Sequence, residues 1–187
     1  MNRVILQTKR GFTIVELLIV IVVIAILAAV SITAYSGVQT RASNTQTSDA
    51  VKQFIKAYHL YALDNGDYPH ATGCLGEGYP DPNHYCLSQS GTSVCWGTGS
   101  ATSPAINTAL KPYMNGKVPS PSMQGAACGT TTYVGAYGYY NSTNKTVTVY
   151  MMLRGDQACP SMSPNVTTVG RAFMDDATRC YYILAAV

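Results

Sequence analysis

The sequence predicts an α+β fold in which one long N-terminal helix is followed by an antiparallel β-sheet. Three observations support this prediction. An apolar run from Phe12 to Val30 continues into an amphipathic pattern that ends near Asn65. β-Branched and aromatic runs then occur on both sides of a turn sequence, and all six cysteines lie beyond the apolar run. The sheet is therefore expected to cover one face of the helix, with loops that are held by disulfides.

The N-terminal run is long enough to cross a membrane. FTIVELLIVIVVIAILAAV has 19 residues that are apolar apart from Thr13 and Glu16, and about 20 apolar residues span a bilayer. Basic residues precede the run without any acidic one, which places the N-terminus in the cytoplasm and the rest outside. The basic residues are Arg3, Lys9 and Arg10.

Helical periodicity continues after the apolar run. One face of the expected helix is apolar and the opposite face is charged or polar. The apolar positions are Val51, Phe54, Ile55, Tyr58 and Ala62, and the polar ones are Asp49, Lys52, Gln53 and Lys56. A helix from Phe12 to about Asp64 would be about 80 Å long. The sequence from Asn65 to Pro69 supplies the stop, because Gly66 can adopt a left-handed conformation and proline cannot continue a helix.

Length and charge limit the possible functions. A chain of 187 residues fits one domain and an appendage. Three of its 12 basic residues precede Gly11, which leaves nine basic and nine acidic residues in the remainder. A neutral body without a basic run has no electrostatic footprint for nucleic acid, so the sequence does not decide whether DNA binds.

The strand signals lie in the last third of the chain. Tyr133–Tyr140 and Thr146–Leu153 flank the turn sequence Asn141–Lys145, and Cys180–Val187 is expected to form a third strand. The region from Tyr68 to about Thr132 is rich in Gly, Ser, Thr and Pro, which predicts long loops with one short helical region near Asn107–Met114. Tyrosines are frequent in the strands and are expected mainly to pack within the sheet.

The cysteine pattern favours disulfides over zinc. An even number of cysteines downstream of a membrane segment indicates an oxidising compartment. Zinc is disfavoured because no Cys-x-x-Cys pair occurs and the histidines lack ligand spacing. Asp156, Asp175 and Asp176 are compatible with a calcium site, but solvated loop carboxylates are the simpler interpretation. No metal or cofactor is therefore predicted.

The residues Lys9-Arg10-Gly11-Phe12-Thr13-Ile14-Val15-Glu16, followed by the apolar run, resemble the class III leader of type IV pilins and pseudopilins. The resemblance covers about the first sixty residues and implies the pilin fold. It implies that a prepilin peptidase cuts between Gly11 and Phe12 and that the new N-terminus at Phe12 is methylated. The expected regions are then a leader (1–11), a long helix (12–65, with 12–30 in the membrane) and a head domain (66–187).

The same resemblance assigns a role to Glu16, which occupies the position of the family's glutamate four residues after the new terminus. A carboxylate in hydrocarbon needs a partner, and in the family this partner is the terminal amine of a neighbouring subunit, which sets the register of assembly. Pairing within its own chain, or reaching to the membrane interface, remains an alternative for Glu16.

Disulfide pairing cannot be derived from the spacing, because six cysteines allow 15 pairings. The family's C-terminal disulfide loop implies a bond between Cys159 and Cys180. The other four cysteines are expected to hold the region from Tyr68 to Thr132. They are Cys74, Cys86, Cys95 and Cys128.

The leading hypothesis is a structural, non-enzymatic subunit of a type IV pilus that serves adhesion, motility or DNA uptake. Its expected partners are other copies, the prepilin peptidase and the inner-membrane assembly machinery. The precursor is expected in the cytoplasmic membrane and the mature chain in an extracellular filament. A pseudopilin of a type II secretion system is the first alternative. A secreted, disulfide-rich binding domain that begins near Ser31 is the second, and an enzyme finds no support in any catalytic motif.

Overall fold

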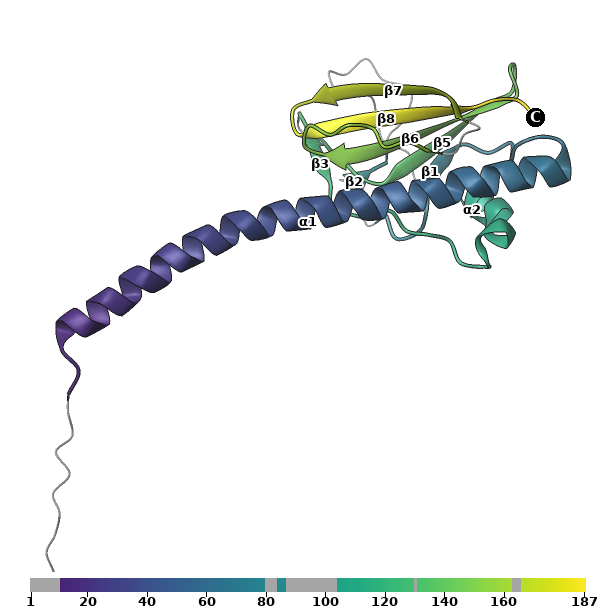
Figure 1. Ribbon diagram of the computed structural model, residues 1–187. Helices are drawn as coiled ribbons and strands as arrows, with labels where there is room; N and C mark the ends of the chain where they lie inside the picture. The colour runs from purple at the N-terminus through teal and green to yellow at the C-terminus, as the bar shows by residue number, and fades with distance from the viewer. Residues whose placement is uncertain (1–10, 80–83, 87–103, 130, 163–165) are drawn as a thin grey trace, which may run out of the picture. The chain divides into compact units, whose positions relative to one another are not determined.

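The computed structural model describes residues 11–79, 84–86, 104–129, 131–162 and 166–187. The chain divides into two compact units, Met1–Gln39 and Thr40–Val187. The boundary falls inside helix α1, Ile14–Asn65 (Figure 1). The predicted helix is confirmed over 52 residues, with its beginning and end close to the expected positions.

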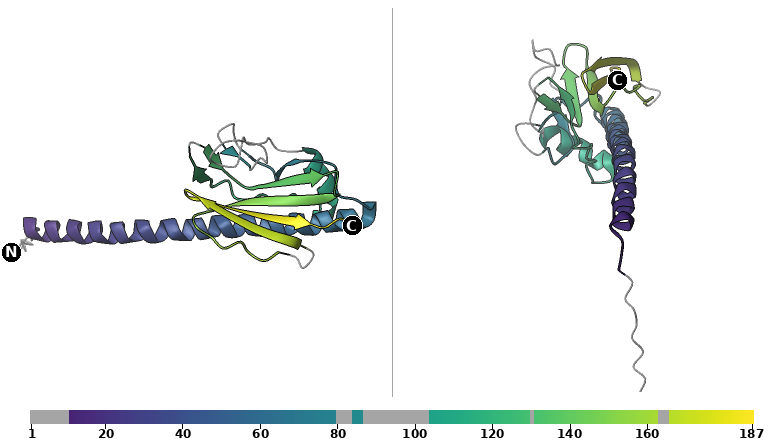
Figure 2. Two further views of the ribbon diagram at one scale, coloured as in Figure 1. Left: turned by 90° about the horizontal axis from the view of Figure 1, so that it is seen from above. Right: turned by 90° about the vertical axis from the view of Figure 1, so that its left-hand side faces the viewer.

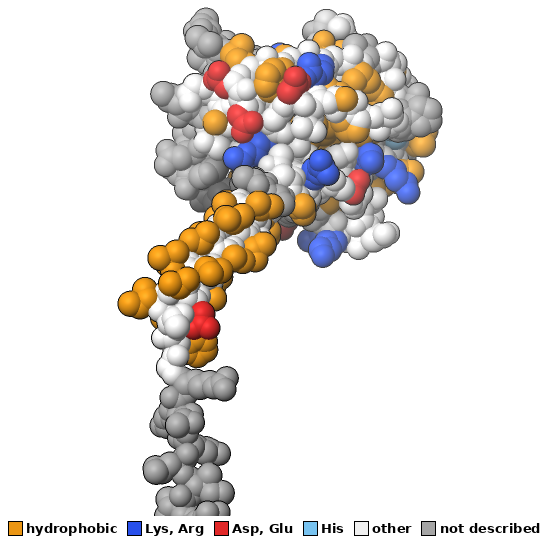
Figure 3. Space-filling model, turned by 60° about the vertical axis from the view of Figure 1, so that its left-hand side comes forward, with side chains coloured by type: hydrophobic (Ala, Val, Ile, Leu, Met, Phe, Trp, Pro, Cys, Tyr) orange, Lys and Arg blue, Asp and Glu red, His pale blue; other side chains and the backbone are white. Residues whose placement is uncertain are grey.

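In the first unit, the large apolar side chains of α1 are exposed. Every large apolar side chain that is described between Phe12 and Val38 is exposed, with values from 47 % for Val23 to 84 % for Ile14. Hydrophobic side chains therefore cover this part of the helix (Figure 3). Such a surface is stable only in an apolar surrounding, because exposing it to water costs about 25 cal/mol per Å².

The second unit contains a five-stranded sheet with the order β1-β5-β6-β8-β7 (Figure 2). All pairings in this sheet are antiparallel. The strands are β1 (Gly73–Leu75), β5 (Ala136–Asn141), β6 (Thr146–Arg154), β7 (Val166–Met174) and β8 (Ala177–Leu184). This arrangement confirms the predicted α+β class, with the C-terminal half of α1 packed on an antiparallel sheet.

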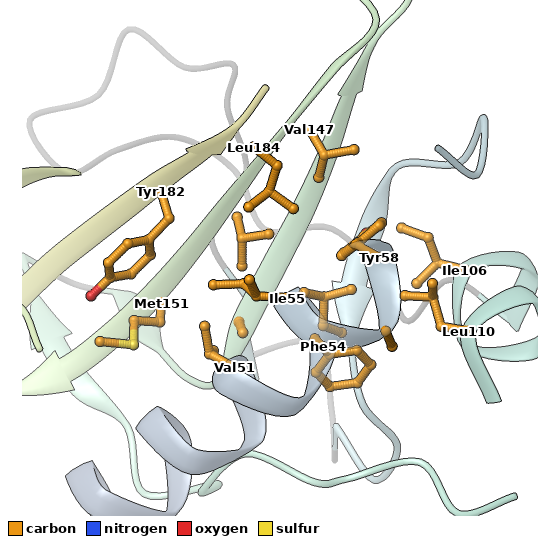
Figure 4. Packing of buried hydrophobic residues seen from close by; sticks show 14 of the residues in the cluster. Val51, Phe54, Ile55, Tyr58, Ile106, Leu110, Val147, Met151, Tyr182 and Leu184 are labelled. Atoms are coloured by element: carbon orange, nitrogen blue, oxygen red, sulfur yellow. The ribbon is translucent and has the colours of Figure 1, made fainter. Parts of the chain in front are cut away.

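The main core lies between α1 and one face of this sheet. The five predicted apolar positions of the helix, Val51 to Ala62, are all 0 % exposed. They pack with Val149 and Met151 of β6 and with Tyr182 and Leu184 of β8 in one buried cluster (Figure 4). The period of the helix and the alternation of the strands thus bring their apolar faces together.

The predicted turn between Asn141 and Lys145 joins β5 to β6. Asn141 Oδ1 accepts hydrogen bonds from the backbone N–H groups of Thr143 and Asn144, at 2.9 and 3.2 Å. Lys145 has a left-handed φ of 51°. Asparagine favours such turns because its side chain can replace a backbone acceptor.

A second, smaller sheet was not predicted. It has the order β2-β4-β3 and consists of β2 (His84–Tyr85), β3 (Ala126–Cys128) and β4 (Thr131–Tyr133). β2 pairs with β4 in parallel, so one strand pair departs from the antiparallel expectation. Cys86, Ala126, Cys128 and Tyr133 share a second buried cluster with Tyr137, Tyr150 and Met152 of the large sheet. These segments were expected as loops because three-residue strands carry too little periodicity to be recognised.

Strand β7 was also missed, and it forms one edge of the large sheet, opposite β1. It carries Gly170, which weakens a strand signal. A Cβ at Gly170 would lie 2.0 Å from the ring of Tyr181, because this ring covers the glycine from the neighbouring strand. The predicted helical region near Asn107–Met114 is present as α2 (Pro104–Leu110) and the 3₁₀ turn η1 (Lys111–Met114).

The part of α1 that belongs to the second unit begins at Thr40. Polar side chains in its first turns form hydrogen bonds with neighbouring segments of this unit. The Asn44 amide donates to Arg154 O at 3.0 Å and accepts from Arg154 N at 2.9 Å. The Ser43 hydroxyl donates to Ser122 Oγ at 2.7 Å, and Ser122 N donates to Thr47 Oγ1 at 3.1 Å. This attachment was not predicted, although a run of Ser, Asn, Thr and Gln inside a helix is a recognisable signal for it.

Candidate functional site

The candidate site lies where α1 begins. Gly11, Phe12 and Thr13 have no regular secondary structure, and the helix starts at Ile14. The bond between Gly11 and Phe12 therefore lies in an exposed, non-helical segment directly before the helix. A protease can bind such a segment without unwinding a helix first.

Thr13 and Glu16 form a reciprocal capping box. Thr13 N and Thr13 Oγ1 each donate a hydrogen bond to Glu16 Oε2 at 2.8 Å, and Glu16 N donates to Thr13 Oγ1 at 3.2 Å. Two backbone N–H groups that have no partner within the helix are thereby satisfied. The local sequence Thr-x-x-Glu encodes this cap, and this pattern is the signal from which the role of Thr13, which was not predicted, could have been found.

The capping box shows which partners the Glu16 carboxylate has within its own chain. The first turn of α1 is otherwise apolar, and a carboxylate without partners is costly in hydrocarbon. Two hydrogen bonds from Thr13 reduce that cost before any second chain is present. Pairing with the terminal amine of a neighbouring chain, as expected from the family, remains a prediction.

The apolar part of α1 meets the requirements of a membrane span. An 18-residue window of this helix has a mean hydropathy of 3.1 and is 0 % buried. Among the described residues, α1 is the one helix that is long and apolar enough to cross a membrane. Because this window is 0 % buried, it differs from the core helix of a soluble protein, which would be largely covered.

Disulfides hold two loops of the second unit. Cys159 and Cys180, the pair expected from the family resemblance, are bonded with their Cα atoms 5.6 Å apart. Cys74 and Cys86 are also bonded, with a Cα separation of 5.7 Å. Cys128 is disulfide-bonded as well, and Cys95 lies outside the described residues.

The three aspartates considered for calcium have other partners. Asp176 accepts a hydrogen bond from Arg154 Nε at 3.2 Å, and Asp156 forms an ion pair with Arg171. Asp175 accepts from Gly129 N at 2.7 Å. Within the described part of the chain, no group of three or more His, Cys, Asp or Glu side chains is placed to hold a metal ion.

The tyrosines of the strands pack mainly within the protein. Tyr137 and Tyr150 belong to the cluster between the two sheets, with ring centroids 6.2 Å apart. Tyr182 is 0 % exposed and donates from its hydroxyl to Pro160 O at 2.9 Å. Tyr139, Tyr140 and Tyr181 are half-buried.

Comparison with known proteins finds a known sequence motif in this N-terminal segment. Residues 6–32 match the family model described as the prokaryotic N-terminal methylation motif. This match includes Gly11, Phe12, Thr13 and Glu16. The matched segment contains the beginning of α1 and its apolar run.

Curated relatives share the same N-terminal region. The chain is 40 % identical over 63 residues to the type IV wide pilus major component PilA4 of Thermus thermophilus, which covers 34 % of this chain and 48 % of the relative. It is 33 % identical over 63 residues to the type II secretion system core protein G of Klebsiella michiganensis, covering 34 % and 44 %. It is 35 % identical over 77 residues to the prepilin peptidase-dependent protein D of Escherichia coli, covering 41 % and 52 %.

In its N-terminal segment, the chain is similar to type IV pilins and pseudopilins. It spans about half the length of the curated relatives that it matches. No solved structure matches the chain.

Proposed function

We propose that the chain is the precursor of a structural subunit of a type IV pilus. The observation that carries the proposal is the N-terminal part of α1, where a run of exposed apolar side chains begins with a capped carboxylate at Glu16. One such helix can lie in a membrane and later pack against identical helices in the centre of a filament. The methylation motif over residues 6–32 supports this proposal.

We expect three steps, which are cleavage, methylation and assembly. The prepilin peptidase cuts between Gly11 and Phe12, and the new amine at Phe12 is methylated. This amine lies at the border of the apolar run, as does the Glu16 carboxylate. During assembly, the amine of one chain pairs with the Glu16 carboxylate of its neighbour, because two opposite charges in an apolar surrounding stabilise each other when close.

The mature N-terminus provides the first test. Mass spectrometry is applied to the chain from cells with and without the peptidase. A peptidase-dependent start at methylated Phe12 supports the proposal. A start near Ser31 would instead indicate a secreted domain, although α1 continues through Ser31 without interruption.

Glu16 provides the second test. Glu16→Ala is expected to leave membrane insertion and cleavage intact and to abolish filaments in sheared surface fractions. Glu16→Asp serves as the matched control, because it retains the charge with a shorter side chain and is expected to assemble in part. Wild-type filament yields from Glu16→Ala would refute the assembly role of this carboxylate.

A pseudopilin of a type II secretion system is the second candidate. The similarity to the core protein G of Klebsiella michiganensis favours it. Deletion of the gene distinguishes the two functions. Loss of surface filaments with normal enzyme secretion indicates a pilus, whereas retention of secreted enzymes in the periplasm indicates a secretion system.

A further inference from the structure

A small cleft lies between α1 and segment 185–187, which follows β8. This segment lies beside the last turns of α1 (Figures 1 and 2). The cleft has a volume of about 380 Å³. Its lining consists of His59 and Leu63 of α1, Tyr68, Thr167 of β7 and segment 185–187. Most of these side chains are apolar, so the cleft is a poor surrounding for a charge.

A single hydrogen bond fastens segment 185–187 at this cleft. The Tyr68 hydroxyl donates to Ala185 O at 2.7 Å. The other hydroxyl of the lining, that of Thr167, donates to Ile183 O within the sheet at 2.9 Å. Residues 185–187 are exposed and have no regular secondary structure. The segment is therefore held by the Tyr68 hydroxyl and by apolar contact.

The imidazole of His59 has a buried atom without a partner. His59 Nε2 is buried and has no hydrogen-bond partner among the described residues. The ring itself is half-buried, and its edge packs against Tyr68 with the centroids 6.4 Å apart. A neutral imidazole carries one N–H, whereas a protonated one carries two and a positive charge. Protonation in place would therefore add a charge whose buried N–H has no acceptor, which is costly.

The elements opposite His59 do not compensate such a charge. Thr167 and segment 185–187 carry no ionisable side chain. Burial raises the pKa of Tyr68, so its hydroxyl stays neutral. The described lining of the cleft thus contains no side-chain carboxylate.

Charged residues of α1 and of the loop after it do not supply a partner either. Lys56 lies three residues before His59 and has the same charge as a protonated imidazole. Asp64 forms a hydrogen bond with Tyr113, and the Asp67 carboxylate accepts hydrogen bonds from two other side chains. Burial lowers the pKa of His59, and no charged group contributes to this change.

We propose that protonation of His59 releases segment 185–187 from α1 and thereby opens the cleft to water. The protonated ring is hydrated in the open form, whereas the closed form leaves its buried N–H without an acceptor. The closed form is therefore stable above the ordinary histidine pKa of about 6.5 and is lost as pH falls below this value. Because one proton is taken up, the ratio of open to closed form rises at most about tenfold per pH unit. This device belongs to the second unit and does not depend on the proposed function.

Nuclear magnetic resonance of the full chain in detergent micelles tests the proposal. The sample carries ¹³C in the histidine rings and in the alanine and valine methyl groups, and pH is lowered from about 8 to about 5. The His59 ring is expected to titrate below about pH 6.5. The methyl groups of residues 185–187 are expected to change with the same midpoint. A His59 ring that titrates at or above 6.5, or methyl groups that do not respond, would overturn the proposal.

Variants separate His59 from other titrating groups. His59→Gln remains neutral and is expected to abolish the acid response of residues 185–187, whereas His70→Gln, at an exposed histidine, is the matched control and retains it. Tyr68→Phe removes the hydrogen bond to Ala185 O, so the ratio of open to closed form is expected to rise roughly fivefold and the midpoint to move to higher pH. An acid response that persists in His59→Gln, or an unchanged midpoint in Tyr68→Phe, contradicts this mechanism.

Discussion

The hydroxyl of Tyr58 provides a sharp test of how the core is packed. Tyr58 is 0 % exposed, and its hydroxyl has no hydrogen-bond partner among the described residues. Burial raises the pKa of Tyr58 above its ordinary value, so the group stays neutral. An unpaired buried hydroxyl costs about 1–3 kcal/mol. Tyr58→Phe is therefore expected to raise the free energy of unfolding by about 1 kcal/mol.

Tyr68 supplies the matched control. Its ring packs against that of Tyr58, with centroids 6.1 Å apart, but its hydroxyl donates to Ala185 O at 2.7 Å. Tyr68→Phe removes this bond and leaves a carbonyl with one partner fewer. It is expected to lower the free energy of unfolding by about 1 kcal/mol. The same chemical change thus acts with opposite sign at two neighbouring positions.

Gly138 in β5 extends the test to a pair of residues. A Cβ at this position would lie 2.3 Å from the Tyr58 hydroxyl oxygen, and the next neighbour is Leu75 Cδ2 at 3.2 Å. Gly138→Ala is therefore expected to destabilise the protein, and less so when Tyr58→Phe has removed the hydroxyl. A coupling of about 0.5–3 kcal/mol is typical of residues in direct contact.

Thermal and denaturant unfolding of the full chain in detergent micelles measures these effects. Near-ultraviolet circular dichroism reports the tyrosines of the core, and about 1 kcal/mol corresponds to a shift of roughly 2–4 °C in Tm. A Tyr58→Phe variant that loses as much stability as Tyr68→Phe would show that the hydroxyl has a buried partner. Strictly additive effects of Gly138→Ala and Tyr58→Phe would show that the two groups do not touch.

Three further predictions concern the second unit. Cys159→Ser opens a loop with a sequence separation of 21 residues, and a loss of about 3 kcal/mol is expected in urea unfolding; unchanged stability would contradict a structural role of this bond. Asn44→Ala removes both hydrogen bonds to the Arg154 backbone and is expected to cost about 1–2 kcal/mol, whereas Gln53→Ala, also on α1, serves as a near-neutral control. The hydrogen bond from His70 holds the pKa of Asp67 below its ordinary value. This carboxylate therefore contributes stability above the unfolded-state pKa of about 3.9, and the contribution is lost as pH falls through the folded-state pKa. Asp67→Asn should reduce the pH dependence of the free energy of unfolding in acid, and an unaltered pH dependence would exclude this contribution.

Local signals predicted the elements that have long or strong patterns. The 52 residues of α1 carry an apolar run, a clean stripe from Val51 to Ala62 and a stop at Asn65 and Gly66. Gly66 has the expected left-handed φ of 74°, and its N–H donates to Ala62 O at 2.8 Å. The β5–β6 hairpin was found for a similar reason, because two alternating runs enclose an asparagine-rich turn. Each of these features depends on residues that are close in the sequence.

Short or glycine-containing elements escaped prediction. β7 follows a polar loop and contains Gly170, whose missing side chain is replaced by the ring of Tyr181 from β8. The three-residue strands β3 and β4 exist because they can pair and cover the tyrosines of the large sheet. Neither the pairing nor the covering of the tyrosines can be predicted from the sequences of these strands alone.

For the candidate site, the sequence by itself determined the match to the N-terminal methylation motif, the apolar helix and the carboxylate at Glu16. These features follow from the order of residues within one turn or one run, and the Thr13–Glu16 cap is equally local. Only the tertiary structure decided the strand order and left the Tyr58 hydroxyl without a hydrogen-bond partner among the described residues. They depend on which distant segments pack together, and packing is set by the combined burial of many side chains rather than by any local pattern.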